Sequence, residues 1–450
     1  MRDAVTHSIG WRHLASKLVF WGCCFALSFG ANLKTADAQS SNDSDLLLMP
    51  SLAPATQAPG WTWGSSLAFL YDSFGQRYEI ADEDTLNLVD EMSGNLLLRF
   101  ERLGRTGITL RNTFGYGEEA VRNDFFGTLD RDWGRLDLRL EEDFRYKNYN
   151  ENSAFTLSST YWVSRSRLRL RWNLSESWRL AVDERWEVTE VRDRTRYNYD
   201  YRRADHGVEL QHNFGFFSSV RGGYIFGTRA VPDSSVIDYE RQAVTLGWLQ
   251  ELGRHSLSMD HIFERRTYGD PLVRSHYVDW QGNISGTLAL REKLRLRPLY
   301  RIWLVEYDQP DSVFADGTEQ SFELLLEGDL GPRTILGVGP RAETRRTESL
   351  FERSYDQLGL KGSISVFAGT RFWMQFTNEI GVRKHLAGTA DSEDFFTDYI
   401  FNWTTLYLSW RFVRQASLDS FLSLNPESHE DAANNTTTLL LSASMTWHLR

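Results

Sequence analysis

The chain has 450 residues, of which 41% are hydrophobic, 14% aromatic and 25% charged, and its formal net charge is -11 at pH 7. A chain with this net negative charge is unlike nucleic-acid-binding proteins, so we expect no nucleic-acid partner. Outside the N-terminal region it has no run of about 18 apolar residues, which excludes a helical membrane protein.

The N-terminal region has the pattern of an export signal. Arg2, Arg12 and Lys17 precede an apolar stretch at residues 18–31, and the Ala36-Asp37-Ala38 triplet offers small residues at a cleavage site. This pattern predicts a signal peptide over residues 1–38. A lipoprotein acylated at Cys23 is the alternative interpretation.

The only cysteines are Cys23 and Cys24, so the chain after residue 38 has none. An exported protein of this size without disulfides must derive its stability from hydrogen-bonded backbone and burial. Residues 39–60 contain a polar "SNDSD" tract followed by three prolines, which predicts a short periplasmic N-terminal segment rather than a folded domain.

From residue 61 onward the hydrophobic pattern has a period of two. In "RLDLRLEEDFRY" (residues 135–146), leucines and aromatics alternate with charged residues, and "RSRLRLRWNL" (165–174) places arginine at every second position. Residues 178–188 and 293–304 repeat the alternation. Such alternation is typical of β-strands with one apolar and one polar face.

Short breaks in this pattern alternate with breaks that are mostly longer and more polar. We expect the longer breaks near residues 72–93, 116–120, 147–153, 191–205, 228–237, 265–276, 306–319, 344–353, 384–398 and 424–435. This spacing predicts a meander of about 20 strands, in the range of about 18 to 22, with both chain ends on the short-turn side. Ala154 to Leu174 is interpreted as one long strand that projects beyond the membrane, although it has room for an extra hairpin.

A soluble β-sandwich also alternates, but a chain this long would then be divided into domains by linkers. No such boundary occurs between Trp61 and Arg450. The prediction is therefore all-β: a transmembrane antiparallel up-and-down β-barrel over residues 61–450, with short periplasmic turns and longer extracellular loops. Aromatic residues near strand ends are expected to form the interfacial girdles: Trp61, Trp63, Tyr71, Tyr399, Trp403, Tyr407 and Trp410.

The final segment, "TTTLLLSASMTWHLR", alternates like a closing strand. On this pattern the chain resembles Gram-negative outer-membrane β-barrel proteins of the porin and export-channel type. The resemblance implies an outer-membrane location, contact with outer-membrane lipid and lipopolysaccharide, and partner export proteins. In that class the last residue is usually aromatic and is read by the assembly machinery, whereas this chain ends in Arg450 and leaves Trp447 as the substitute.

A barrel of about 20 strands has a lumen wider than side chains alone can fill. TonB-dependent receptors of this broad class close it with a plug domain, for which residues 39–60 are too short. Three consecutive strands direct arginines toward the expected lumen: Arg135, Arg139, Arg145, Arg165, Arg167, Arg169, Arg171, Arg179 and Arg185. This ladder is the candidate site, where anionic solutes or an acidic polysaccharide would be guided through the channel.

The alternative is a salt-bridged scaffold, because acidic residues share the same strand faces: Asp137, Glu141, Asp143, Asp183 and Glu187. Among the loops, residues 72–90 and 306–319 are acidic, and residues 192–203 and 265–274 have an arginine excess. Acidic outer loops would bind the divalent cations that bridge lipopolysaccharide, or they form an ordinary solvated surface.

Two rival classes remain. A barrel enzyme, such as a lipid hydrolase or protease, would use His206 with His212 or His255 with His261, each pair on one strand face. No nucleophile elbow, HExxH or phosphate loop accompanies them, so we expect no enzyme activity, no cofactor and no metal site. The second rival class is a sheath that holds a separate partner protein in its lumen.

Overall fold

The structure is a computed structural model. It describes residues 61–80, 83–102, 106–117, 120–149, 160–192, 199–215, 217–232, 234–311, 314–349, 354–386, 397–430 and 434–449. The expected signal peptide (1–38) and N-terminal segment (39–60) lie outside the described residues. Among the described residues, no helix has the length and apolar character needed to cross a membrane.

The described chain forms 20 β-strands and one short 3-10 helix, η1, in a single sheet. The strands are β1 (Trp61–Ile80), β2 (Glu83–Arg102), β3 (Thr106–Gly117), β4 (Ala120–Asp132), β5 (Leu136–Tyr149), β6 (Tyr161–Asn173), β7 (Trp178–Val191), β8 (Tyr201–Asn213), β9 (Ser219–Ala230), β10 (Tyr239–Leu252), β11 (His255–Tyr268), β12 (Tyr277–Arg291), β13 (Leu294–Tyr307), β14 (Gly317–Asp329), β15 (Thr334–Thr347), β16 (Tyr355–Ala368), β17 (Phe372–His385), β18 (Tyr399–Val413), β19 (Ala416–His429) and β20 (Thr436–His448). Helix η1 (Ser235–Ile237) lies between β9 and β10. The strand count confirms the prediction of about 20.

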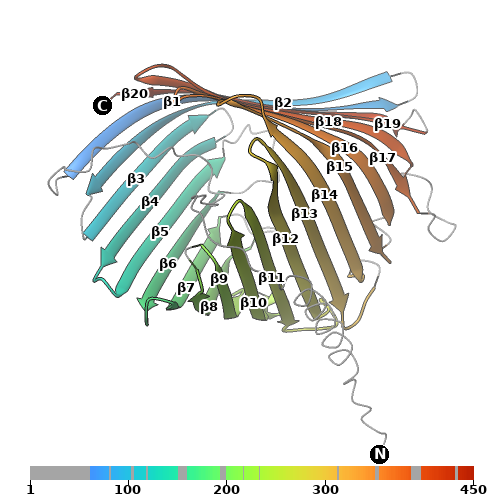
Figure 1. The fold of residues 1–450 in the computed structure, drawn as a ribbon. Helices are drawn as coiled ribbons and strands as arrows, with labels where there is room; N and C mark the ends of the chain where they lie inside the picture. The colour runs from blue at the N-terminus through green and yellow to red at the C-terminus, as the bar shows by residue number, and fades with distance from the viewer. Residues whose placement is uncertain are drawn as a thin grey trace, which may run out of the picture. The chain divides into compact units, whose positions relative to one another are not determined.

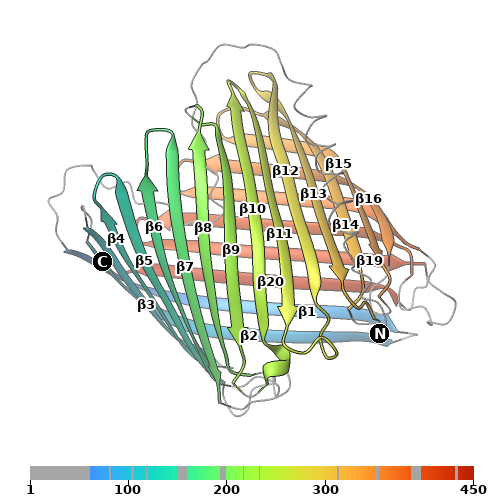
Figure 2. The ribbon, with the colours of Figure 1, turned by 90° about the horizontal axis from the view of Figure 1, so that it is seen from below.

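The strands form an antiparallel meander that closes on itself (Figure 1; Figure 2). Successive strands along the chain are neighbours in the sheet. This includes β10 and β11, between which Arg241 and Glu264 form an ion pair. The first and last strands pair over the register Ser66↔His448 to Tyr78↔Thr436. Closure gives each described strand a neighbour on both sides, which is the condition for a sheet to cross lipid.

Ion pairs between strands that are not neighbours identify the inner face of the barrel. Arg221 on β9 reaches Asp260 on β11 at 2.6 Å, and Lys361 on β16 reaches Glu323 on β14 at 2.8 Å. Both pairs cross an intervening strand. Side chains converge in this way only on the concave side of a curved sheet, so the charged face is the lumen wall.

Glycine makes one of these crossings possible. Gly247 lies on β10 between the strands of Arg221 and Asp260, opposite Arg221 in the register. A Cβ atom at Gly247 would collide with the Arg221 side chain, which passes directly over the glycine. The missing side chain at residue 247 therefore gives the arginine its path across β10.

The opposite face of the strands is apolar and exposed. Its residues include Leu140 (40% exposed), Val208 (47%), Leu246 (51%), Leu360 (53%) and Ile400 (58%). These strands together carry an apolar surface around the barrel, far larger than the isolated patches normal on a soluble protein. Such a surface is stable in contact with lipid, which explains the alternation seen in the sequence.

The two rims of the barrel have different connections. At the rim where β1 begins and β20 ends, connections are short, such as 133–135, 253–254 and 414–415. At the other rim, the connections from β5 onward are longer, as in 150–160 and 386–398. We refer to these as the terminal rim and the loop rim.

Three expectations about the breaks differ from the structure. Residues 72–80 and 83–93 are strand, because β1 and β2 pair continuously from Trp61↔Arg102 to Ile80↔Glu83. An antiparallel ladder pairs the N–H and C=O groups of its own backbone. Acidic residues, which would be excluded from lipid, can therefore form strands where a hairpin extends into water. The connection near residues 116–120 is also short, at residues 118–119. The long strand expected to begin at Ala154 corresponds to β6, which begins at Tyr161. Residues 150–159 lie outside the described residues.

Candidate anion-guiding wall

The candidate site is the inner face of β5, β6 and β7. The strands pair with registers that include Glu141↔Arg167 and Arg169↔Asp183, so their odd-numbered residues share one face. Because the alternation repeats every two residues, most of the charged side chains of the three strands lie side by side there. The leucines and tryptophans lie on the other face, together with Glu142, Glu184 and Glu190.

Asp183 on β7 is the centre of this wall. Its carboxylate accepts hydrogen bonds from Arg167 Nη2 at 2.6 Å, Arg169 Nε at 2.9 Å and Arg185 Nε at 2.7 Å. One negative charge is thus shared by three guanidinium groups. The Asp183 side chain is 20% exposed, so water screens these contacts only in part.

The remaining paired arginines have one main carboxylate each. Arg139 donates to Glu141 at 2.5 Å, and Arg167 approaches the second oxygen of Glu141 at 3.9 Å. Nearer the loop rim, Arg145 pairs with Asp143 at 2.7 Å and Arg165 pairs with Glu187 at 3.2 Å. These contacts realise part of the salt-bridged scaffold that the sequence left as the alternative.

Three of the nine candidate arginines are arranged differently. Arg171 has no carboxylate within ion-pair distance among the described residues, and Arg179 donates instead to the neutral Asn173 side chain at 3.0 Å. Arg135 is exposed in the turn before β5, where its carbonyl accepts the Asn173 amide. It therefore lies outside the strand on which the sequence placed it, because the turn occupies residues 133–135, with Gly134 at a φ of +86°.

The wall has a surplus of positive charge. Around Asp183, four arginines (Arg139, Arg167, Arg169 and Arg185) contact only three carboxylates (Asp130, Glu141 and Asp183). Toward the terminal rim, Arg171 lies opposite Asp137 in the register, and Arg179 adds a further cation. The net positive character of the wall is therefore a property of the assembled strands and not only of the isolated segment 165–171.

Sequence reasoning missed two further arginine clusters on the inner face. Arg241 and Arg266 pair with Glu264, which is 6% exposed, at 2.6 and 2.5 Å. Arg341 bridges Glu343 and Glu379 at 2.6 and 2.9 Å. Arg241 lies opposite Gly227 and Arg341 lies opposite Gly359, and these pairings depend on strand registers that the sequence does not give. In these clusters the carboxylates are buried and neutralised, which distinguishes them from the β5 to β7 wall.

The predicted girdle is correct only in part. Trp61, Trp63 and Trp410 are exposed on the outer face, at 58%, 69% and 46%. Tyr399, Trp403 and Tyr407 instead face the lumen, as shown for the first two by the Arg383 guanidinium, 5.4 Å from the Tyr399 ring and 5.6 Å from the Trp403 ring. Strand β18 carries apolar residues on both faces, so alternation could not distinguish its inner side from its outer side.

The histidines of the enzyme hypothesis lie on the outer face. His206 pairs with Glu184 across β8 and β7, and His261 accepts a hydrogen bond from Trp280 Nε1 at 3.3 Å. His212 packs against Trp178 with ring centroids 4.4 Å apart. Neither pair points into the lumen. Within the described ranges, no group of three or more His, Cys, Asp and Glu side chains is placed to hold a metal ion.

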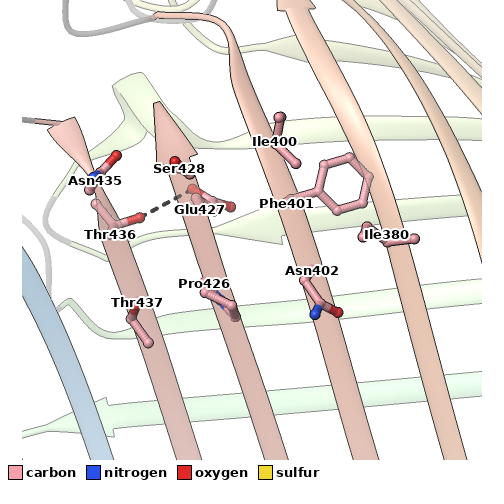
Figure 3. A pocket seen from close by; sticks show the side chains of 10 residues that line it. All are labelled: Ile380, Ile400, Phe401, Asn402, Pro426, Glu427, Ser428, Asn435, Thr436 and Thr437. Atoms are coloured by element: carbon pink, nitrogen blue, oxygen red, sulfur yellow. Dashed lines mark hydrogen bonds between the residues drawn. The ribbon is translucent and has the colours of Figure 1, made fainter. Parts of the chain in front are cut away.

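A hollow of about 310 Å³ lies between β18, β19 and β20 near the loop rim (Figure 3). The β18 and β19 ladder is interrupted between the pairs Phe401↔Glu427 and Thr404↔Leu424, beside Pro426, which has no amide proton to donate. Ile380, Ile400 and Pro426 line the hollow together with polar residues, so it is a shallow gap in the wall without converging charged groups.

No family model matches the chain, and no curated protein sequence matches it. Solved structures with a similar fold include the copper transporter OprC, with a TM-score of 0.56 and 11% identity, covering 88% of this chain and 82% of that one. The siderophore receptor PirA from Pseudomonas aeruginosa has a TM-score of 0.53 and 10% identity, covering 88% and 81%. The alcaligin outer-membrane receptor FauA from Bordetella pertussis has a TM-score of 0.51 and 13% identity, covering 84% and 75%.

The closed barrel, the apolar outer wall and the charged lumen define a transmembrane β-barrel of the Gram-negative outer-membrane type. The resemblance drawn from the sequence is thereby confirmed at the level of fold. At 10 to 13% identity, the similarity to these structures concerns the fold alone.

Proposed function

We propose that the protein is an outer-membrane channel whose β5 to β7 wall attracts and guides anionic solutes, and that it has no catalytic activity. The observation that supports the proposal most directly is the surplus of guanidinium groups on this wall, where Asp183 alone is shared by three arginines. A fixed positive wall concentrates anions locally and repels cations, which biases passage through a pore.

Arg171 and Arg179 are the best placed to act on a passing solute. Their guanidinium groups are not engaged by carboxylates of the described residues, so a solute carboxylate, sulfate or phosphate does not have to displace an internal partner. Guanidinium binds such groups with two parallel hydrogen bonds. They follow one another across the β6 and β7 pair near the terminal rim, where a solute would enter or leave the lumen.

The test is the reversal potential of the purified protein in a planar bilayer under a KCl gradient. Wild type is expected to prefer chloride. The double variant Arg171→Gln with Arg179→Gln removes two positive charges without touching the Asp183 cluster, and its reversal potential should shift toward cation preference. The matched control, Arg171→Lys with Arg179→Lys, keeps both charges and should retain the wild-type value.

Two results would overturn the proposal. A folded, inserted protein that never conducts contradicts a channel, and an unchanged reversal potential in the glutamine variant contradicts the role of the wall. Reversing the charge at Arg167 and Arg169 is a less selective test, because it also disrupts the contacts of Asp183.

The same chemistry applies to small anions and to an acidic polysaccharide, since both present groups that guanidinium binds. Arginines at every second position of β6 are about 7 Å apart along the strand, so a polymer would contact several of them in succession. Reversible block of chloride current by an acidic polysaccharide, with no block by a neutral one of equal length, would favour the polymer as the solute.

A further inference from the structure

A group of polar and ionisable side chains lies on the outer face of β5 to β8, at the middle of the strands. Its members are Glu142, Ser164, Ser166, Glu184 and His206, and we call it the outer polar patch. Ser164 donates to one oxygen of Glu142 at 2.6 Å and Ser166 to the other at 2.5 Å, while His206 Nδ1 is hydrogen-bonded to Glu184. Figure 1 shows the four strands side by side.

The patch faces lipid, not the lumen. Its residues are even-numbered on β5 to β8, so their side chains are on the opposite face of the sheet from Asp183 and the arginines of the wall. On β7, Glu184 lies between Val182 and Trp186, and on β8, His206 lies between Val208 and Ala204. Apolar residues therefore occur on both sides of the patch along each strand, which places it at mid-height of the apolar band.

An ionisable group at this depth is costly and indicates a functional contact. A lipid headgroup does not satisfy it, because headgroups lie at the edges of the apolar band and not at its centre. Internal hydrogen bonds compensate only part of the cost. Glu142 has accepted one hydrogen bond on each oxygen and retains further lone pairs. His206 contacts Glu184 through Nδ1, and its side chain is 46% exposed.

The donors and acceptors of the patch are self-complementary. Two copies inserted in the same direction are related by a two-fold axis along the membrane normal. Glu142 on β5 and His206 on β8 are three strand spacings apart, about 14 Å. An axis between β6 and β7 places His206 of one copy opposite Glu142 of the other, and the reverse, with Trp186 of both copies near the axis.

We propose that the outer face of β5 to β8 is the interface of a symmetric dimer, in which His206 Nε2 of each copy is hydrogen-bonded to the Glu142 carboxyl group of the other. The contact removes both groups from lipid. The proposal concerns the outer wall and is independent of the function assigned to the lumen.

The test uses oxidative cross-linking in the membrane. The chain has only Cys23 and Cys24, so the full-length Cys23→Ser, Cys24→Ser background is cysteine-free. Leu168→Cys places one thiol on the outer face of β6, opposite Glu184 and beside the proposed axis. Ser420→Cys on the outer face of β19 is the matched control. A disulfide-linked dimer should form with Leu168→Cys and not with Ser420→Cys.

Adding Glu142→Leu and His206→Phe to the Leu168→Cys chain should reduce the dimer band to the level of the Ser420→Cys control. These changes replace lipid-facing polar groups by apolar ones, so folding should be retained, as checked by the gel mobility shift on heating; Glu142→Gln provides a milder second variant. A missing dimer, equal dimers from both cysteines, or a dimer unaffected by all these substitutions would overturn the proposal. An adduct of Leu168→Cys with a different protein would also overturn it and would identify another occupant of the face.

Discussion

Replacing Asp183 by asparagine should destabilise the barrel and make the lumen more cationic. The substitution removes a charge that receives hydrogen bonds from Arg167, Arg169 and Arg185 and leaves three guanidinium groups facing one another. A charge-assisted hydrogen bond contributes about 1.5 to 3 kcal/mol when shielded and well under 1 kcal/mol when exposed. The wall is partly hydrated and asparagine keeps one acceptor oxygen, so we expect a loss of about 2 to 3 kcal/mol in the free energy of unfolding.

Urea unfolding of the refolded protein in lipid vesicles, followed by the fluorescence of its 16 tryptophans, measures this loss. Asp130→Asn is the matched control, because Asp130 lies on the same wall, makes a single 3.7 Å contact with Arg139 and is half exposed. It should change the unfolding free energy by less than about 0.5 kcal/mol. Equal effects of the two substitutions would refute the view that Asp183 holds the wall together. The reversal potential of Asp183→Asn should also move toward stronger anion preference.

Three further predictions test the fold. Gly339→Ala places a methyl group against the facing backbone carbonyl and should cost more than about 2 kcal/mol in urea unfolding, whereas Gly94→Ala, with open space around it, should cost less than about 1 kcal/mol. Leu360→Arg on the outer face should cost about 2 to 4 kcal/mol in vesicles and Ser363→Arg on the inner face almost nothing, and the reverse order would contradict the assigned faces. Gly369→Ala, at a φ of +64°, should lower stability by about 1 kcal/mol, measured by the same titration.

The sequence predicted the number of strands. It also predicted which side chains face the lumen and which face lipid, where a strand has one apolar and one charged face. In β5 to β7 the period of two places Leu138 and Arg139 on opposite faces without ambiguity. In β18, aromatic residues occupy both faces, so Tyr399 and Trp403 were assigned to the wrong side. The hairpin of β1 and β2 was misjudged for a related reason, because acidic residues predict a loop only if the strand is required to remain in lipid.

The pairing of individual charges could not be predicted from the sequence. That Asp183 is opposite Arg169 and within reach of Arg167 depends on the register between β6 and β7, which the turn at residues 174–177 sets. Contacts across an intervening strand, such as Arg221 with Asp260, depend in addition on the curvature of the closed barrel and on Gly247. The local alternation of apolar and charged residues specifies neither the strand register nor the curvature of the barrel.

The ion pairs that span an intervening strand also bear on how the barrel is assembled. Arg341 on β15 has Glu343 beside it on the same strand, but its second carboxylate, Glu379, arrives only with β17. Lys361 on β16 likewise depends on Glu323, two strands earlier. A sheet that ends at β15 therefore leaves Glu323 without Lys361, and a sheet that ends at β15 or β16 leaves Arg341 without Glu379. The strands added next supply these partners. Completion of the wall neutralises these charges, and a truncated barrel is left with an electrostatic defect at its last strand.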